Sequence, residues 1–176
     1  DENTTIKHLI EDSADLKADM ILEVVEAFEN KTITSTPQNP SGVVLSYPRL
    51  PRDGNIDWHQ SAEYLERQIR SVTRPYPGAF TYYIDPNGAV KKLYIWEAAV
   101  VEDVPEFVGV PGHVVKNDKN SGESHVLTGD GILRLQKVQW DNEEGDFEPG
   151  KNWKSVQIRL GITLGDLAEV LRVNNK

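Results

Sequence analysis

Apolar residues recur at helical spacing in two stretches of the chain, residues 4–29 and residues 61–72. The first stretch places its apolar residues on one side and its acidic residues on the other. The apolar set is Ile6, Leu9, Ile10, Ala14, Met20, Ile21, Val24, Val25 and Phe28. A helix cannot bury such a stripe by itself. We therefore expect residues 4–29 to form a helix that docks on another surface.

The second stretch carries start and stop signals. Asp53-Gly54 is a turn signal, and Ser61 is placed to cap the helix. Pro75 and Pro77-Gly78 end the helix, because the residue before a proline is pushed out of the helical region. The apolar stripe consists of Ala62, Leu65, Ile69 and Val72. The pattern predicts an amphipathic helix that begins after Ser61.

Two pairs of opposite charges lie one turn apart on this helix. Glu63 precedes Arg67 by four residues. Glu66 precedes Arg70 by the same spacing. This orientation is the favourable one, worth roughly 0.2–0.5 kcal/mol per pair. We expect both pairs to form on the helix surface.

The remaining segments predict a linker, a set of strands and a last helix. Residues 32–52 are rich in proline, with a short β-prone run at 43–45, and predict an extended inter-domain linker. Aromatic and β-branched runs predict strands at 80–84, 90–101, 113–116, 125–128, 132–140 and 153–160. Residues 164–173 predict a short helix. Short strands separated by glycine turns indicate a small closed barrel, so the fold class is α+β.

The charge of the chain is acidic and unevenly distributed. Of the net −9, residues 1–32 contribute −6, from nine acidic residues and three lysines, and the rest contributes −3. Binding along a nucleic-acid backbone needs clustered Lys and Arg. We therefore do not expect nucleic acid to be a partner.

Other compositional features bear on the compartment. The chain has no cysteine and hence no disulfide framework. It has no apolar run long enough to span a membrane and no basic, apolar leader. We expect a cytoplasmic protein without a membrane partner. Residue 1 is Asp rather than Met, so we expect a processed chain or a piece of a longer protein.

Four short motifs follow one another between Asp53 and Phe80. They are Asp53-Gly54-Asn55-Ile56-Asp57-Trp58, Ser61-Ala62-Glu63, Arg67-Gln68-Ile69-Arg70 and Pro75-Tyr76-Pro77-Gly78-Ala79-Phe80. This series resembles the carboxy-terminal part of the 10-formyltetrahydrofolate-dependent formyltransferases, the family of the methionyl-tRNA and amino-sugar formyltransferases. The resemblance extends over about residues 4–139. Within it, Thr73 to Pro77 is more similar to the amino-sugar branch, which agrees with the acidic charge.

The resemblance implies a division of the chain. Residues 1–31 would be the last helix of a catalytic domain, residues 32–52 the inter-domain linker, and residues 53–176 a β-barrel domain resembling an OB-fold. In the family, an Asn, a His and an Asp upstream of this region carry out formyl transfer. No residue here matches them, so the resemblance implies no catalytic residue and no cofactor in this chain. The full-length family uses 10-formyltetrahydrofolate, and this chain alone is expected to be inactive.

The best candidates for substrate binding are Arg70, Arg74 and Tyr76. Two guanidinium groups and a phenol beside a rigid Pro-Tyr-Pro exit could hold a phosphate or carboxylate. The alternative is that Arg70 pairs with Glu66 and that Tyr76 packs on the barrel. Likewise, the aromatic residues Tyr82, Tyr83, Tyr94 and Trp96 predict either a base-stacking platform or ordinary packing, and packing is favoured.

No metal site is predicted. None of the four histidines lies at metal-ligand spacing from another. Residues 118–122 resemble a calcium loop only in part, because the glycine comes one position early and the terminal glutamate is missing.

Together these features predict an accessory domain in one-carbon metabolism. It would complete an acceptor-substrate site or mediate assembly, with a formyltransferase catalytic domain as partner. Self-association through residues 4–29 is a second way to cover the apolar stripe. The alternative function is a stand-alone, non-catalytic binding or protein-interaction module with an OB-like barrel.

Overall fold

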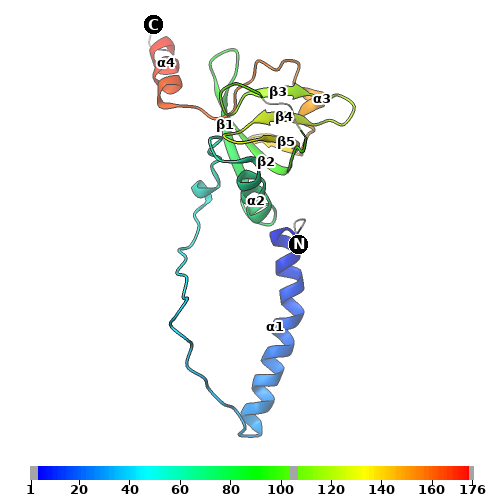
Figure 1. Ribbon diagram of the computed structural model, residues 1–176, viewed down its shortest axis with the longest axis vertical. Coiled ribbons are helices and arrows are strands. Elements are labelled where there is room, and N and C mark those ends of the chain that lie inside the picture. Colours follow the sequence, from blue (N-terminus) through cyan, green and yellow to red (C-terminus); the bar gives the residue numbers. More distant parts are fainter. Residues whose placement is uncertain (1–3, 104–106, 175–176) are drawn as a thin grey trace. The chain divides into compact units, whose positions relative to one another are not determined.

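The computed structural model describes residues 4–103 and 107–174 of the 176-residue chain (Figure 1). The chain divides into two compact units, residues 1–50 and residues 51–176. The buried apolar residues of the described chain all lie in the second unit. Within the described residues, no helix is both long and apolar enough to cross a membrane.

The first unit is one long helix followed by an extended segment. The helix α1 spans Ile6–Glu29, within the predicted range, and none of its residues is buried. Residues 32–50 form no helix or strand, and the β-prone run at 43–45 is no exception. The apolar stripe of α1 therefore faces no core of its own.

The second unit contains an antiparallel sheet. It begins with η1 (Pro51–Gly54) and α2 (Ala62–Val72). The strands are β1 (Ala79–Ile84), β2 (Val90–Val100), β3 (Val114–Asn117), β4 (Ser124–Leu127) and β5 (Ile132–Trp140). They pair in the order β1-β2-β5-β4-β3, and every pair is antiparallel. The helices α3 (Pro149–Asn152) and α4 (Leu164–Asn174) follow. The predicted α+β class is confirmed.

The two edges of the sheet, β1 and β3, are joined by residues 158–161. The Gly161 N–H donates to the Tyr82 carbonyl of β1 at 2.8 Å. The Val114 N–H of β3 donates to the Ile158 carbonyl at 2.9 Å. One segment therefore bonds to both edges and closes the sheet into a small barrel.

The predicted strand over 153–160 is wrong. Only Arg159 and Leu160 make isolated bridges within this segment. The Trp153 N–H is bonded to the Pro149 carbonyl at the end of α3, so the chain is still turning where the strand was expected to begin. The closing contact also needs Gly112, since a side chain there would collide with the Leu160 carbonyl.

The helix α2 fills the core of the barrel with its predicted stripe. Ala62, Leu65 and Ile69 are at most 2 % exposed and belong to the same core cluster as interior residues of β2 and β5. The Ser61 side chain accepts the Tyr64 N–H at 3.2 Å and caps the helix as predicted. The sequence pattern and the packing agree at this helix.

The prediction of an ion pair between Glu63 and Arg67 on α2 is wrong. Arg67 Nε donates to the backbone oxygen of Glu63 at 3.3 Å, rather than to its carboxylate. The carbonyl one turn back lies within reach of the guanidinium and takes its hydrogen bond.

Candidate functional site

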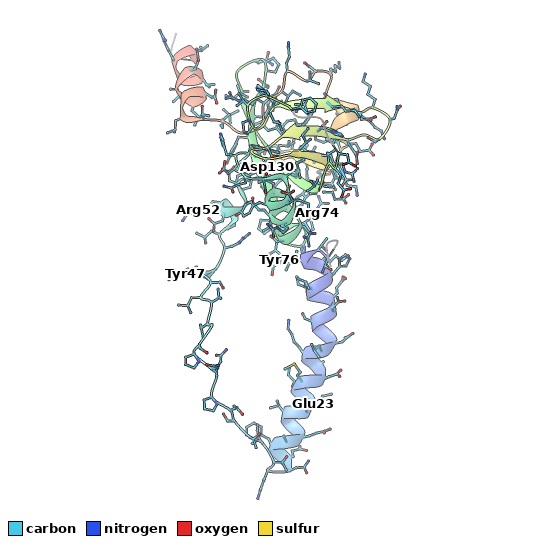
Figure 2. The ribbon with its side chains drawn as sticks, in the orientation of Figure 1. Glu23, Tyr47, Arg52, Arg74, Tyr76 and Asp130 are labelled. Carbon is cyan, nitrogen blue, oxygen red and sulfur yellow. The ribbon has the colours of Figure 1, made fainter. Side chains whose placement is uncertain are left out.

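The three predicted binding residues lie on α2 and its exit but have separate partners. Arg70 Nε lies 2.9 Å from Glu66 Oε1, and both side chains are about four-fifths buried. Tyr76 is half-exposed. Figure 2 shows Arg74 and Tyr76 near the end of α2. The structure therefore provides the predicted helix pair for Arg70, and it joins Arg74 to residues outside the predicted set.

Arg74 clamps the end of α2 to the loop that follows β5. Its Nη1 and Nη2 donate to the two oxygens of Asp146 at 2.7 and 2.5 Å, and Nη2 also donates to Gln139 Oε1 at 3.2 Å. A bidentate guanidinium–carboxylate pair of this kind is strong and directional. The hydrogen bond from Arg74 lowers the pKa of Asp146 below the ordinary aspartate value.

Arg74 also ends a column of aromatic and basic side chains. Its guanidinium carbon lies 4.1 Å from the Trp96 ring centroid, and Trp96 stacks on Tyr94 at 5.6 Å. Lys92 Nζ then lies 4.3 Å from the Tyr94 ring and 4.2 Å from the Phe80 ring. Each cation–aromatic contact is worth about 0.5–1 kcal/mol where it is exposed. The rings of Phe80, Tyr94 and Trp96 therefore each contact a basic side chain of the protein itself.

Packing at Trp96 depends on a glycine. Gly78 has φ +86°, and a Cβ atom there would lie 2.6 Å from the Trp96 ring. The Trp96 Nε1–H donates to Gln139 Oε1 at 2.9 Å. Tyr83 lies elsewhere and contacts Trp140, at 6.1 Å between ring centroids. The four aromatic residues considered as a stacking platform are thus split between two surroundings.

Two open pockets share Trp140, at the end of β5, and Glu143, in the loop that follows. One has a volume of about 380 Å³ and is lined by Lys91 and Lys92 together with Tyr82. The other has a volume of about 370 Å³ and contains no basic residue in its lining. Its lining residues include the aromatic Trp140, Phe147 and Trp153 and the acidic Glu143, Glu144 and Asp146. Both pockets use the loop that Arg74 holds.

The histidine nearest the start of α2 belongs to a turn. His59 Nδ1 lies 3.1 Å from Asp57 Oδ1, and the same carboxylate oxygen accepts the His59 N–H at 3.1 Å. That backbone bond is the main reason why the pKa of Asp57 is lowered. The neighbouring Trp58 is buried and donates from Nε1 to Thr81 Oγ1 at 3.0 Å. These contacts fix Asp57 and His59 in a turn and hold the Trp58 ring in the core.

Among the residues that the structure describes, no group of three or more His, Asp, Glu or Cys side chains could hold a metal ion.

The partners of Arg74 could not be read from the sequence. Asp146 lies 72 residues from Arg74, in an acidic loop that has no motif. Gln139 is a single amide in a strand. The Glu66–Arg70 pair could be predicted from its four-residue spacing on a helix. No such spacing rule links two residues that lie 72 positions apart.

Comparison with known proteins identifies a family that matches most of the sheet-containing unit. The family described as "Formyl transferase, C-terminal domain" matches residues 50–147. The methionyl-tRNA formyltransferase of Symbiobacterium thermophilum is 37% identical over 137 residues, which are 78% of this chain and 40% of that protein. The methionyl-tRNA formyltransferase of Lachnospira eligens is 31% identical over 169 residues, 94% of this chain and 51% of that protein.

A solved structure shares the fold. HypX from Aquifex aeolicus in complex with tetrahydrofolic acid aligns with a TM-score of 0.53 at 18% identity, over 80% of this chain and 26% of that chain. The chain spans about two fifths to one half of the length of the curated relatives. Because the family match covers more than half of its residues, the chain belongs to the formyl transferase C-terminal domain family.

Proposed function

We propose that this chain is the accessory carboxy-terminal domain of a 10-formyltetrahydrofolate-dependent formyltransferase. It docks through α1 on a catalytic domain and supports use of the acceptor amine, without transferring the formyl group itself. The observation that carries this proposal is the exposed apolar stripe of α1. The barrel, by contrast, is already closed and has its own core.

The stripe is large enough for a stable interface. Seven large apolar side chains of the stripe are between 40 and 64 % exposed. They are Leu9, Ile10, Met20, Ile21, Val24, Val25 and Phe28. Complete burial of a side chain of this kind contributes roughly 1.5–3 kcal/mol, so covering their exposed half represents on the order of 10 kcal/mol before the costs of association. Exposed apolar surfaces of this extent mark interaction sites.

The charge beside the stripe favours a partner over a second copy. Residues 1–32 have a net charge of −6. Two copies of α1 packed face to face would bring acidic flanks together, which opposes pairing. An apolar surface with a basic rim fits better. We assign that surface to the catalytic domain, because the resemblance places residues 1–31 there.

The acceptor is an amine, and two classes compete. The matched relatives are methionyl-tRNA formyltransferases, whereas Tyr76 and the acidic charge favour an amino-sugar. Several basic side chains of the second unit are paired with carboxylates: Arg74 with Asp146, Lys92 with Asp141, Lys116 with Asp118, Arg134 with Glu123 and Lys137 with Glu97. We expect no appreciable tRNA binding by this chain alone at physiological salt.

The test is a chimera. The matched part of the Symbiobacterium thermophilum relative is replaced by this chain, and formyl transfer to methionyl-tRNA and to amino-sugars is followed by product mass. The chain alone should give no turnover above background, because loss of even one polarising donor costs about a hundredfold to a thousandfold. The chimera should be active on one acceptor class. Ile21→Asp with Phe28→Asp should abolish that activity, and Glu23→Gln on the acidic side should not.

Two results would contradict the proposal. One is turnover by the chain alone. The other is a chimera whose activity is unaffected by the two stripe substitutions, which would favour the stand-alone interaction module.

A further inference from the structure

The pocket lined by Trp140, Phe147 and Trp153, the acidic aromatic pocket, is built on an anchored loop. The loop leaves β5 after Trp140 and returns at Phe147, where it pairs with Val138 through two backbone hydrogen bonds of 2.8 and 3.0 Å. The rings of Trp140 and Phe147 lie 5.9 Å apart at 30°. Arg74 holds the loop from outside through Asp146. The aromatic wall is therefore fixed before any ligand arrives.

The charge of the pocket is negative after internal pairing. Asp146 is neutralised by Arg74, while Glu143 and Glu144 lie on the exposed loop. Among the described residues, no ion pair joins either glutamate to a basic side chain. The lining of the pocket thus combines three aromatic residues with two glutamates that form no ion pair among the described residues.

The neighbouring pocket, which shares Trp140 and Glu143 with the acidic aromatic pocket, shows what this ring accepts. There Lys91 Nζ lies 5.7 Å from the centroid of the Trp140 ring. Lys92 Nζ lies 3.7 Å from Asp141 in the same pocket. The protein already places its own ammonium groups against an aromatic ring and a carboxylate. The lining of the acidic aromatic pocket offers the same two kinds of group and contains no Lys or Arg, while Arg74 pairs with Asp146 from outside.

We propose that the acidic aromatic pocket binds a small organic cation, an alkylammonium group. The electron-rich ring face of tryptophan attracts such a cation, by about 0.5–1 kcal/mol where exposed and about 2 kcal/mol where water is excluded. Glu143 and Glu144 add a longer-range attraction. A volume of about 370 Å³ accommodates a substituted ammonium of a few carbon atoms. The site is independent of the proposed docking of α1.

The test compares a cation with its neutral analogue. Choline and 3,3-dimethyl-1-butanol have the same shape and differ in charge. Each is titrated into the full chain at constant ionic strength, and the four indole N–H signals are followed by NMR. Choline should shift the Trp140 signal with a dissociation constant on the order of millimolar, and the alcohol should bind at least about fivefold more weakly.

Variants separate the pocket from general charge. Glu143→Gln with Glu144→Gln should weaken choline binding by about fivefold. Glu23→Gln with Glu26→Gln on α1 removes the same net charge and should leave the affinity unchanged. Trp140→Phe should bind more weakly than the parent, and Trp140→Leu more weakly still, provided that both keep the parent's thermal unfolding midpoint.

Three results would overturn the proposal. The first is equal binding of the alcohol and choline. The second is an equal loss of affinity in the two double-glutamine variants. The third is full affinity in a folded variant that lacks the Trp140 ring.

Discussion

The helices α1 and α2 carry the same apolar period and have opposite fates. In α2 the stripe residues Ala62, Leu65 and Ile69 are at most 2 % exposed. In α1 seven of the nine stripe residues are 40 to 64 % exposed, and no residue is buried. Hydrophobic periodicity therefore identifies which side of a helix will be buried, but it does not identify the partner.

The difference comes from what surrounds each helix in the chain. The helix α2 is fixed at its start by the Ser61 cap and at its end by Thr73 Oγ1, which donates to the Trp96 carbonyl at 3.1 Å. The strands that follow supply the apolar surface it needs. After α1 the chain continues as a proline-rich segment without strands, so no helix or strand among the described residues of the first unit covers its stripe.

The largest expected difference in stability is between two variants, one that truncates a buried side chain of the α2 stripe and one that truncates an exposed side chain of the α1 stripe. Leu65→Ala should lower the free energy of unfolding of the barrel by about 2–5 kcal/mol, because it leaves a cavity in a packed core. Ile21→Ala, at a position that is 62 % exposed, should change it by less than about 0.5 kcal/mol. Urea unfolding followed by tryptophan fluorescence measures both. Similar losses in the two variants would mean that α1 is packed in the isolated chain.

A smaller effect on stability should come from breaking the Arg74–Asp146 ion pair, which links the end of α2 to a loop distant in the sequence. At neutral pH Asp146→Asn should cost up to about 1 kcal/mol, since Arg74 is half-exposed and solvent screens the pair. The pKa of Asp146 is lowered in the folded chain, so the stabilisation is present above the unfolded pKa of about 3.9 and is lost as the pH falls through the folded pKa.

The measurement is the difference in unfolding free energy between the parent and Asp146→Asn at several pH values. The gap should be constant above about pH 5 and should shrink below about pH 4. A gap that grows on acidification would show that the carboxylate has another role.

The smallest effects concern local ion pairs on the two helices. Glu66→Gln should cost roughly 0.2–0.5 kcal/mol, because Glu66 precedes Arg70 by four residues and both side chains are largely buried. Glu11→Gln should cost less, since Lys7 precedes Glu11 in the weaker orientation and the pair is well exposed. Thermal unfolding of each variant, with Glu63→Gln as an unpaired control, tests the order. A larger loss from Glu11→Gln would reverse it.

Local patterns predicted the elements, and long-range contacts escaped prediction. Ser61, the α2 stripe and the Glu66–Arg70 pair each depend on residues within one or two turns, where spacing carries the signal, although the same spacing failed for Glu63 and Arg67. Closure of the barrel by residues 158–161 depends on bonds to Tyr82 and Val114, which are far away in the sequence. The same holds for the Arg74–Asp146 clamp, where opposite charges have many alternative partners along the chain.

We propose that the stripe of α1 is covered by a catalytic domain, whereas the stripe of α2 is covered by its own barrel. Hydrogen exchange of backbone amides tests both statements in one experiment, performed on this chain and on the chimera with the Symbiobacterium thermophilum relative. We predict that amides of α2 are protected in both proteins, and that amides of Ile6–Glu29 exchange rapidly in the chain alone and slowly in the chimera. Equal exchange of α1 in the two proteins, whether slow or fast, would contradict the claim.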